Sequence, residues 1–184
     1  MRKIIATISL SVDGYFCGPN GEIDWFVLDK EFDDHSLEVL DTVDTFLFGR
    51  TTYEGMANYW PTQGDKYNPE VAKRMNGYAK IAVSDKPIDL SWNNSQQLQG
   101  DLIEEVTKLK QQEGANICIY GSGDIVRQLT DAGLIDEYNL LIDPVILGDG
   151  KTLFKGVKHR TALNLNEVRQ FKSGVVLHNY TLQK

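Results

Sequence analysis

Cysteine is scarce in this chain, which has only Cys17 and Cys118 among its 184 residues. Two thiols so far apart in the sequence do not form the closely spaced pattern of a disulfide framework, so we expect a reduced, cytoplasmic setting. Cys118 lies in an apolar run and is expected to be a buried small hydrophobe. Cys17 has no basic neighbour in the sequence that would activate its thiol.

Long apolar runs are also missing, since no segment approaches the roughly 20 apolar residues of a membrane span. The first residues, MRKIIATISLSVDGYF, have the basic start and apolar stretch of a signal peptide, but their alternation of apolar and polar residues favours a first strand. Basic residues number 19 against 26 acidic ones, which gives a formal charge of -7. That balance argues against a nucleic-acid or anionic-membrane surface. The three histidines lie on different expected elements without ligand spacing, which argues against a metal site.

Apolar residues make up 41% of the chain, enough for a substantial core in one domain spanning residues 1–184. Strand-like runs alternate with helix-like patterns up to about Leu134, and strands follow without helices. The first part predicts a parallel sheet with helices on both faces, and the tail predicts antiparallel strands at its edge. The expected strands cover 3–16, 45–48, 80–84, 117–120, 137–142, 161–171 and 175–182.

Helices are expected from Asp33 or Asp34, from Thr51 or Thr52, across 101–113, and after the glycine turn at 121–123. The region 55–77 has the least regular pattern and contains Pro61 and Gly64. It is interpreted as a lid over a site or as a surface loop.

Residues 116–129, NICIYGSGDIVRQL, have the order of a buried strand, a glycine turn and an amphipathic helix. Backbone N–H groups at such a helix start, together with the helix dipole, favour a phosphate. The alternative is a tight turn with no ligand, because a lone Gly-x-Gly pattern is a weak signal.

Two more strand ends carry polar groups. Residues 49–54, GRTTYE, follow the strand at 45–48, and there Arg50 and the two threonine hydroxyls can bind phosphate or simply cap the helix. Ser84 and Lys86 lie at the C-terminal end of the strand at 80–84. Since ligands in open α/β sheets sit beyond the carboxyl ends of the strands, the three ends together predict one phosphate-rich ligand, a nucleotide.

Several motifs resemble the dihydrofolate reductase fold in both content and order: SLSVDG at 9–14, GRTTYE at 49–54, VS at 83–84 and YGSG at 120–123. The run AGLIDE at 132–137, followed by PVILGDGKTLF at 144–154, is similar to the reductase domain of the bifunctional riboflavin-biosynthesis deaminase/reductase and to its stand-alone bacterial relatives. The similarity covers nearly the whole chain. The zinc-binding deaminase half is absent from this sequence.

The resemblance implies a three-layer α/β/α fold with a mixed, mostly parallel central sheet and antiparallel C-terminal strands. It also implies NADPH as cofactor, hydride transfer to a small pteridine- or pyrimidine-like heterocycle, and a homodimer in which the C-terminal strands form the interface. By position, the cofactor-binding residues are Gly49, Arg50, Thr51, Thr52, Ser84, Lys86, Gly121, Ser122, Gly123, Asp124 and Ile125. Ser122, in place of a second glycine, fits only with ordinary backbone angles, and Asp124 fits only if its carboxylate turns away from the phosphates.

Hydride transfer needs orientation, a dry pocket and a polar group facing the substrate. Asp24 is the first candidate for that catalytic group and Asp13 the second, with Asp29 behind them; the alternative for each is a turn residue. Trp25, Tyr53 and Trp60 can stack on a flat substrate or belong to the core. A non-catalytic nucleotide-binding or sensing module with the same fold remains the alternative function.

Overall fold

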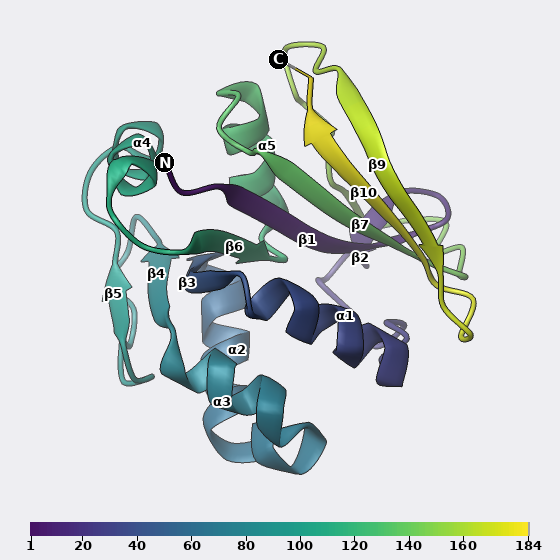
Figure 1. Cartoon of the computed structure of the whole chain (residues 1–184), viewed down its shortest axis with the longest axis horizontal. Coiled ribbons are helices and arrows are strands. Elements are labelled where there is room, and N and C mark those ends of the chain that lie inside the picture. Colours follow the sequence, from purple (N-terminus) through teal and green to yellow (C-terminus); the bar gives the residue numbers. More distant parts are fainter. Residues whose placement is uncertain (184) are drawn as a thin grey trace.

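The computed structural model describes residues 1–183, which form one α/β body (Figure 1). The helices are α1 (Lys30–Leu40), α2 (Arg50–Tyr67), α3 (Pro69–Gly77), α4 (Leu102–Gln111) and α5 (Gly123–Asp131). The strands are β1 (Ile4–Ser11), β2 (Tyr15–Cys17), β3 (Val43–Gly49), β4 (Ala79–Val83), β5 (Ser95–Gln97), β6 (Asn116–Tyr120), β7 (Glu137–Asp143), β8 (Lys151–Thr152), β9 (Leu163–Gln170) and β10 (Val176–Leu182).

Eight strands form the central sheet in the order β5-β4-β3-β6-β1-β7-β10-β9. The first six pair in parallel, whereas β10 runs antiparallel to β7 and β9 antiparallel to β10. The short strands β2 and β8 form a separate antiparallel pair. The mixed, mostly parallel sheet with antiparallel C-terminal strands confirms the predicted fold class.

Two apolar layers pack on opposite faces of the sheet, which makes the fold three-layered. Ile4, Ala6 and Ile8 of β1 face one cluster, to which α4 and α5 contribute their apolar sides. Ile5 of β1 faces the other cluster, where it joins residues from α1, α2 and α3. Successive strand residues point to opposite faces, so a strand buried on both sides reads as the continuous apolar run seen at the start of the chain.

The region 55–77 is helical, which corrects the expectation of a lid or loop. The helix α2 runs through Pro61, and α3 follows after Asn68. Gly64 is buried, and a Cβ placed there would lie 2.7 Å from the Trp60 ring and 3.0 Å from the Ala72 side chain. The glycine that looked like a helix breaker therefore lets α2 and α3 pack closely.

Side chains cap three of the five helices. Asp29, Asn68 and Asp101 accept hydrogen bonds from backbone N–H groups at the starts of α1, α3 and α4. The expected caps at Asp33 or Asp34 are wrong, because the first helix begins four to five residues earlier, directly after Asp29. No helix within residues 1–183 combines the length and the apolar character that a membrane span requires.

Candidate functional site

The strands β4, β3 and β6 are neighbours in the sheet and pair in parallel, so their carboxyl ends lie at the same edge. These are the three strand ends that the sequence marked with glycine, arginine and hydroxyl residues. Each strand is followed by a segment predicted from the sequence to contribute to phosphate binding. Parallel pairing thus brings together groups that are far apart in the chain, at the edge where open α/β sheets bind ligands.

The turns after β3 and β6 touch directly. The backbone N–H of Gly49 donates to the Ser122 hydroxyl at 2.8 Å. Ser122 has φ 62° and ψ 58°, so the condition of ordinary backbone angles that the cofactor role set for this residue is not met. A left-handed conformation costs a non-glycine residue roughly 1–2 kcal/mol, and the hydrogen bond to Gly49 offsets part of that cost.

No side-chain cap closes the starts of α2 and α5. Gly49 occupies the N-cap position of α2, so Thr51 and Thr52, the expected caps, lie inside the helix instead. Helix starts without a cap present free backbone N–H groups and the positive end of the helix dipole. Two such starts lie next to each other here, which makes the edge of β3 and β6 a good receptor for a diphosphate.

The carboxylate of Asp124 is turned outward. Its side chain is 88% exposed and lies 3.4 Å from the guanidinium of Arg127, one turn along α5. Gly121 has φ 66°, a conformation that favours glycine, and it faces Thr52, since an added Cβ would lie 3.4 Å from the Thr52 methyl group. Gly123 and Ile125 are buried at the start of α5.

The polar candidates on the other two strand ends are exposed or locally engaged. Arg50 lies 3.5 Å from Glu54, and both side chains are 46% exposed. The Ser84 hydroxyl donates to the carbonyl of Lys86 and accepts from its N–H, so this serine closes its own turn. Lys86 is exposed. Arg50 and Lys86 are thus the exposed cations at this edge, and the Ser84 hydroxyl is already partnered.

Asp13 is bound into a turn. Its carboxylate accepts from the Ser11 hydroxyl and from the backbone N–H groups of Leu147 and Gly148. These hydrogen bonds, led by that of Ser11, hold the pKa of Asp13 below its usual value, so it stays a carboxylate and is a poor proton donor. Asp24 is exposed in the segment between β2 and α1.

The three aromatic candidates do not form one surface. Trp25 is half-buried, meets Phe26 edge-on and donates its indole N–H to the carbonyl of Glu22. Trp60 donates to the Met56 sulfur within α2. Tyr53 is fully buried and packs against Trp92, which places it in the core. Of the three, Trp25 is the one beside Asp24.

A second group of residues, which sequence reasoning missed, lines a cavity of about 440 Å³ at the start of α5. Phe16, Arg127 and Lys151 contribute to its walls together with Gly123 and Asp124. A Cβ on Gly123 would lie 2.5 Å from the Phe16 ring, so the glycine makes room for the aromatic wall. The turn before Lys151 was visible in the sequence, but its pairing with β2, which sets the cavity, was not.

Asp143 is a buried carboxyl group at the carboxyl end of β7 and is another residue that sequence reasoning missed. It is 1% exposed, and one oxygen accepts from the Val27 N–H at 2.8 Å. The other oxygen has no hydrogen-bond partner within residues 1–183. Burial raises the pKa of Asp143, against the opposing effects of Val27 and Ser9. This contact fixes the segment that carries Asp24 and Trp25 to the end of the sheet.

Replacing Asp143 by asparagine should change how stability depends on pH. A carboxyl whose folded pKa is raised above 3.8 stabilises the fold below pH 3.8, and this contribution is lost as pH rises through the folded pKa. Asparagine keeps an oxygen for Val27 and does not titrate. The unfolding free energy of the native protein should therefore fall relative to that of Asp143→Asn between pH 3.8 and neutrality. Urea titrations at several pH values measure this difference, and parallel profiles would contradict the assignment.

No group of three or more His, Cys, Asp or Glu side chains within residues 1–183 is placed to hold a metal ion.

Comparisons with known proteins agree with the α/β fold described above. Residues 2–177 match the model of the RibD C-terminal domain. The Bacillus subtilis (strain 168) protein YyaP is 34% identical over 176 residues, covering 95% of this chain and 92% of that protein. A putative riboflavin biosynthesis protein from Shewanella sp. PV-4 has a similar structure, with a TM-score of 0.76, 19% identity and 99% of both chains covered.

Dihydrofolate reductase from Enterococcus faecalis, solved in complex with NADP(H) and RAB-propyl, also has a similar structure. Its TM-score is 0.63 at 16% identity, with 99% of this chain and 97% of that chain covered. The chain therefore has a dihydrofolate reductase-like fold and belongs to the family of the RibD C-terminal domain, a membership that supports an oxidoreductase-type role.

Proposed function

We propose that this protein is an NADPH-dependent reductase. The observation that supports this most strongly is the pair of uncapped helix starts, α2 and α5, side by side at the carboxyl ends of β3 and β6. The other three helices all have an Asp or Asn cap. Because unpaired N–H groups at a helix start favour an anion, this contrast indicates where a pyrophosphate would bind.

In this proposal the turns at Gly49 and at residues 121–125 hold the pyrophosphate. The donors are the N–H groups at 122–124, because those of Gly121 and Ile125 already donate to the carbonyls of Thr7 and Ser122. Thr51 and Thr52 lie in the first turn of α2 and add hydroxyl groups. Arg50 and Lys86 reach the 2′-phosphate, with Ser84 shaping the turn that carries Lys86. Bound NADPH would supply a hydride, while the chain supplies orientation and excludes water.

The substrate in this proposal is a small pteridine- or pyrimidine-like heterocycle. Asp24 is the polar group that faces it, and Trp25 stacks beside it. The Asp143–Val27 contact sets the position of both residues relative to the sheet. Asp13 acts through the turn at Leu147 and Gly148 rather than as an acid. Tyr53 and Trp60 support the core behind the site.

Titration with NADPH and with NADH tests the cofactor assignment. NADPH should bind more tightly, because its 2′-phosphate adds charge-assisted hydrogen bonds to cations at this edge, each contributing about 1.5–3 kcal/mol. Lys86→Ala should narrow the difference between the two cofactors. Equal affinity for both, or no binding of either, would refute NADPH dependence.

The alternative function is a nucleotide-binding or sensing module without catalysis. The bond from Gly49 N–H to Ser122 supports it, since a donor that phosphate would use is occupied by a side chain. Following NADPH absorbance with a panel of pteridines and pyrimidines separates the two. Turnover of any heterocycle would exclude the module, whereas tight NADPH binding without turnover would favour it.

Changing Ser122 to glycine should release the Gly49 N–H and relieve the left-handed strain. The lost hydrogen bond, worth about 0.5–1.5 kcal/mol, and the relieved strain, about 1–2 kcal/mol, nearly cancel in stability. Because the Gly49 N–H becomes available to phosphate, NADPH affinity should rise. Because the two stability terms nearly cancel, the melting temperature should stay close to that of the native protein. Ser122→Ala is the matched control: it keeps the strain, loses the bond and should be about 1 kcal/mol less stable. Unchanged affinity in Ser122→Gly would contradict a role for Gly49 N–H.

A homodimer through the C-terminal strands is part of the proposal. The strand β9 is an edge strand with one free side, and Leu165 and Val168 on it are 55% and 56% exposed. Free strand edges and exposed apolar side chains both favour association. Sedimentation of the native protein and of Val168→Lys tests this.

A reduced, cytoplasmic setting is also proposed, because Cys17 and Cys118 are both free thiols.

A further inference from the structure

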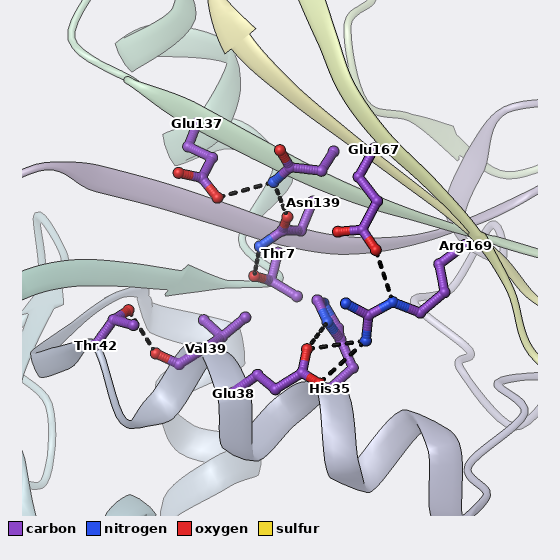
Figure 2. Close-up of polar contacts among 10 residues, drawn as sticks. Thr7, His35, Glu38, Val39, Thr42, Glu137, Asn139, Glu167 and Arg169 are labelled. Carbon is purple, nitrogen blue, oxygen red and sulfur yellow. Dashed lines mark hydrogen bonds and ion pairs between the residues drawn. The ribbon is translucent and has the colours of Figure 1, made fainter.

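A cavity of about 180 Å³ lies between α1 and the sheet, well away from the strand ends discussed above (Figure 2). Ile5 and Glu137, which line it, are paired at the beginnings of β1 and β7. The nucleotide edge lies at the opposite, carboxyl ends of the parallel strands. Other walls come from α1, β9 and β10, whose polar side chains converge on one another in Figure 2.

His35 of α1 lines this cavity with unused hydrogen-bonding capacity. The residue is 5% exposed, and neither ring nitrogen has a hydrogen-bond partner within residues 1–183. Its Nδ1 lies 3.6 Å from a Glu38 oxygen, beyond hydrogen-bond distance. Burial, aided by the charge of Arg169 and opposed by Glu38 and Glu167, lowers the pKa of His35. The ring is therefore neutral near pH 7, with one donor and one acceptor unmatched.

Negative charge dominates the rest of the lining. Glu38, Glu137 and Glu167 contribute three carboxylates against one guanidinium, that of Arg169, which leaves a net charge of -2 around the cavity. The guanidinium bonds Glu38 at 2.9 Å and Glu167 at 2.8 Å. A buried anion would meet excess carboxylate, so the lining favours a cation.

The floor of the cavity is a fixed amide network. Asn179 donates to Glu137 at 2.8 Å and to Asn139 at 2.6 Å, and Asn139 reaches the Thr7 hydroxyl at 3.5 Å (Figure 2). These bonds hold the Glu137 carboxylate in place without neutralising it. The network therefore holds the Glu137 carboxylate ready to accept from a further, charged donor.

We propose that this cavity is a second ligand site, which binds a primary ammonium group carried on a short aliphatic chain. The ammonium group donates to the carboxylates and to the acceptor nitrogen of His35, and the chain packs on Ile5, Val39 and Leu177. The volume equals that of about six water molecules, which is enough for four carbons and a nitrogen. A metal ion is not the expected cation, since no three-ligand group is placed to hold one within the described residues.

Titration of the protein, without nucleotide, with n-butylammonium chloride tests the proposal, and butan-1-ol and sodium butyrate serve as neutral and anionic probes of the same length. The ammonium salt should bind saturably with a Kd on the order of 1 mM and shift the imidazole NMR signals of His35. Similar binding of the alcohol or the carboxylate would overturn the proposal, as would binding that leaves the His35 signals unchanged. The absence of saturation would mean that the cavity holds water only.

Two variants identify the carboxylates that carry the binding. Glu137→Gln and Glu167→Gln should each weaken ammonium binding about tenfold, as expected for a lost charge-assisted hydrogen bond. Glu104→Gln removes the same charge from an exposed position on α4, on the other face of the sheet, and should leave binding unchanged. Equal weakening in all three variants would show a general charge effect and overturn a specific site.

Discussion

An alanine at position 150 should lower the free energy of unfolding by about 2–4 kcal/mol, because it combines overpacking with backbone strain. Gly150 has φ 152°, a conformation that side chains rarely adopt, and an added Cβ would lie 2.3 Å from the backbone oxygen of Cys17. The Tyr15 ring would be 3.1 Å away. Since the nearest clashing atom belongs to the backbone, β2 or the turn itself must move.

Gly148→Ala is the matched control for this prediction, because it lies in the same turn. Its φ is 77°, but no atom outside its own neighbours lies within 4 Å of the added Cβ. That variant should lose only the left-handed penalty of roughly 1–2 kcal/mol. Urea unfolding of both proteins measures the difference. Equal losses would show that the contact between the turn and Cys17 does not constrain the fold.

The pairing of β2 with β8 also forms part of the cavity at the start of α5, because Tyr15, Gly150 and Lys151 all line it. Gly150→Ala should therefore alter this cavity as well as stability. Gly148 does not line this cavity, so Gly148→Ala should leave the cavity unchanged and is the control for binding as well. A loss of NADPH affinity in Gly150→Ala alone would connect this cavity with the nucleotide edge.

The order of strands and helices could be predicted from the sequence because each buried strand is an apolar run with a polar or glycine residue after it. The sequence therefore marks the ends of β4, β3 and β6, which the sheet order makes neighbours. The region 55–77 was misinterpreted for a related reason. Pro61 and Gly64 look like breaks in a local pattern, yet the packing of Trp60 and Ala72 around Gly64 keeps the chain helical.

The details of the site depend on contacts between residues far apart in the chain, which local patterns do not contain. Ser122 adopts a left-handed conformation while its hydroxyl bonds Gly49, a partner 73 positions away. Asp143 follows the apolar run of β7 in the sequence, which does not show that the segment carrying Val27 covers it and donates to its carboxylate. His35 has no ligand-like spacing to the other histidines in the sequence, and it is the packing of α1 against β7 and β9 that surrounds it with Glu137, Glu167 and Arg169.

Arg50→Ala should weaken NADPH binding by about 1.5–3 kcal/mol, which corresponds to roughly a 10- to 150-fold higher Kd. The side chain is 46% exposed and its contact in the free protein is Glu54 at 3.5 Å. Exposed ion pairs of this kind contribute about 0–1 kcal/mol, so the variant should fold normally. Affinity for NADH should fall less than affinity for NADPH, because the 2′-phosphate is the group proposed to meet Arg50. Fluorescence titration with both nucleotides measures the two effects.

Glu54→Gln is the informative partner of this variant, because it removes the competing carboxylate and keeps the size of the side chain. If Arg50 binds phosphate, freeing it from Glu54 should tighten NADPH binding, whereas a purely structural Arg50 would leave the Kd unchanged. Although both residues belong to the same ion pair, Arg50→Ala should thus raise the Kd for NADPH and Glu54→Gln should lower it. An increase in Kd in both variants would instead indicate that the pair acts as a unit that shapes the start of α2, and the phosphate contact would have to come from Lys86 and the backbone of the two helix starts.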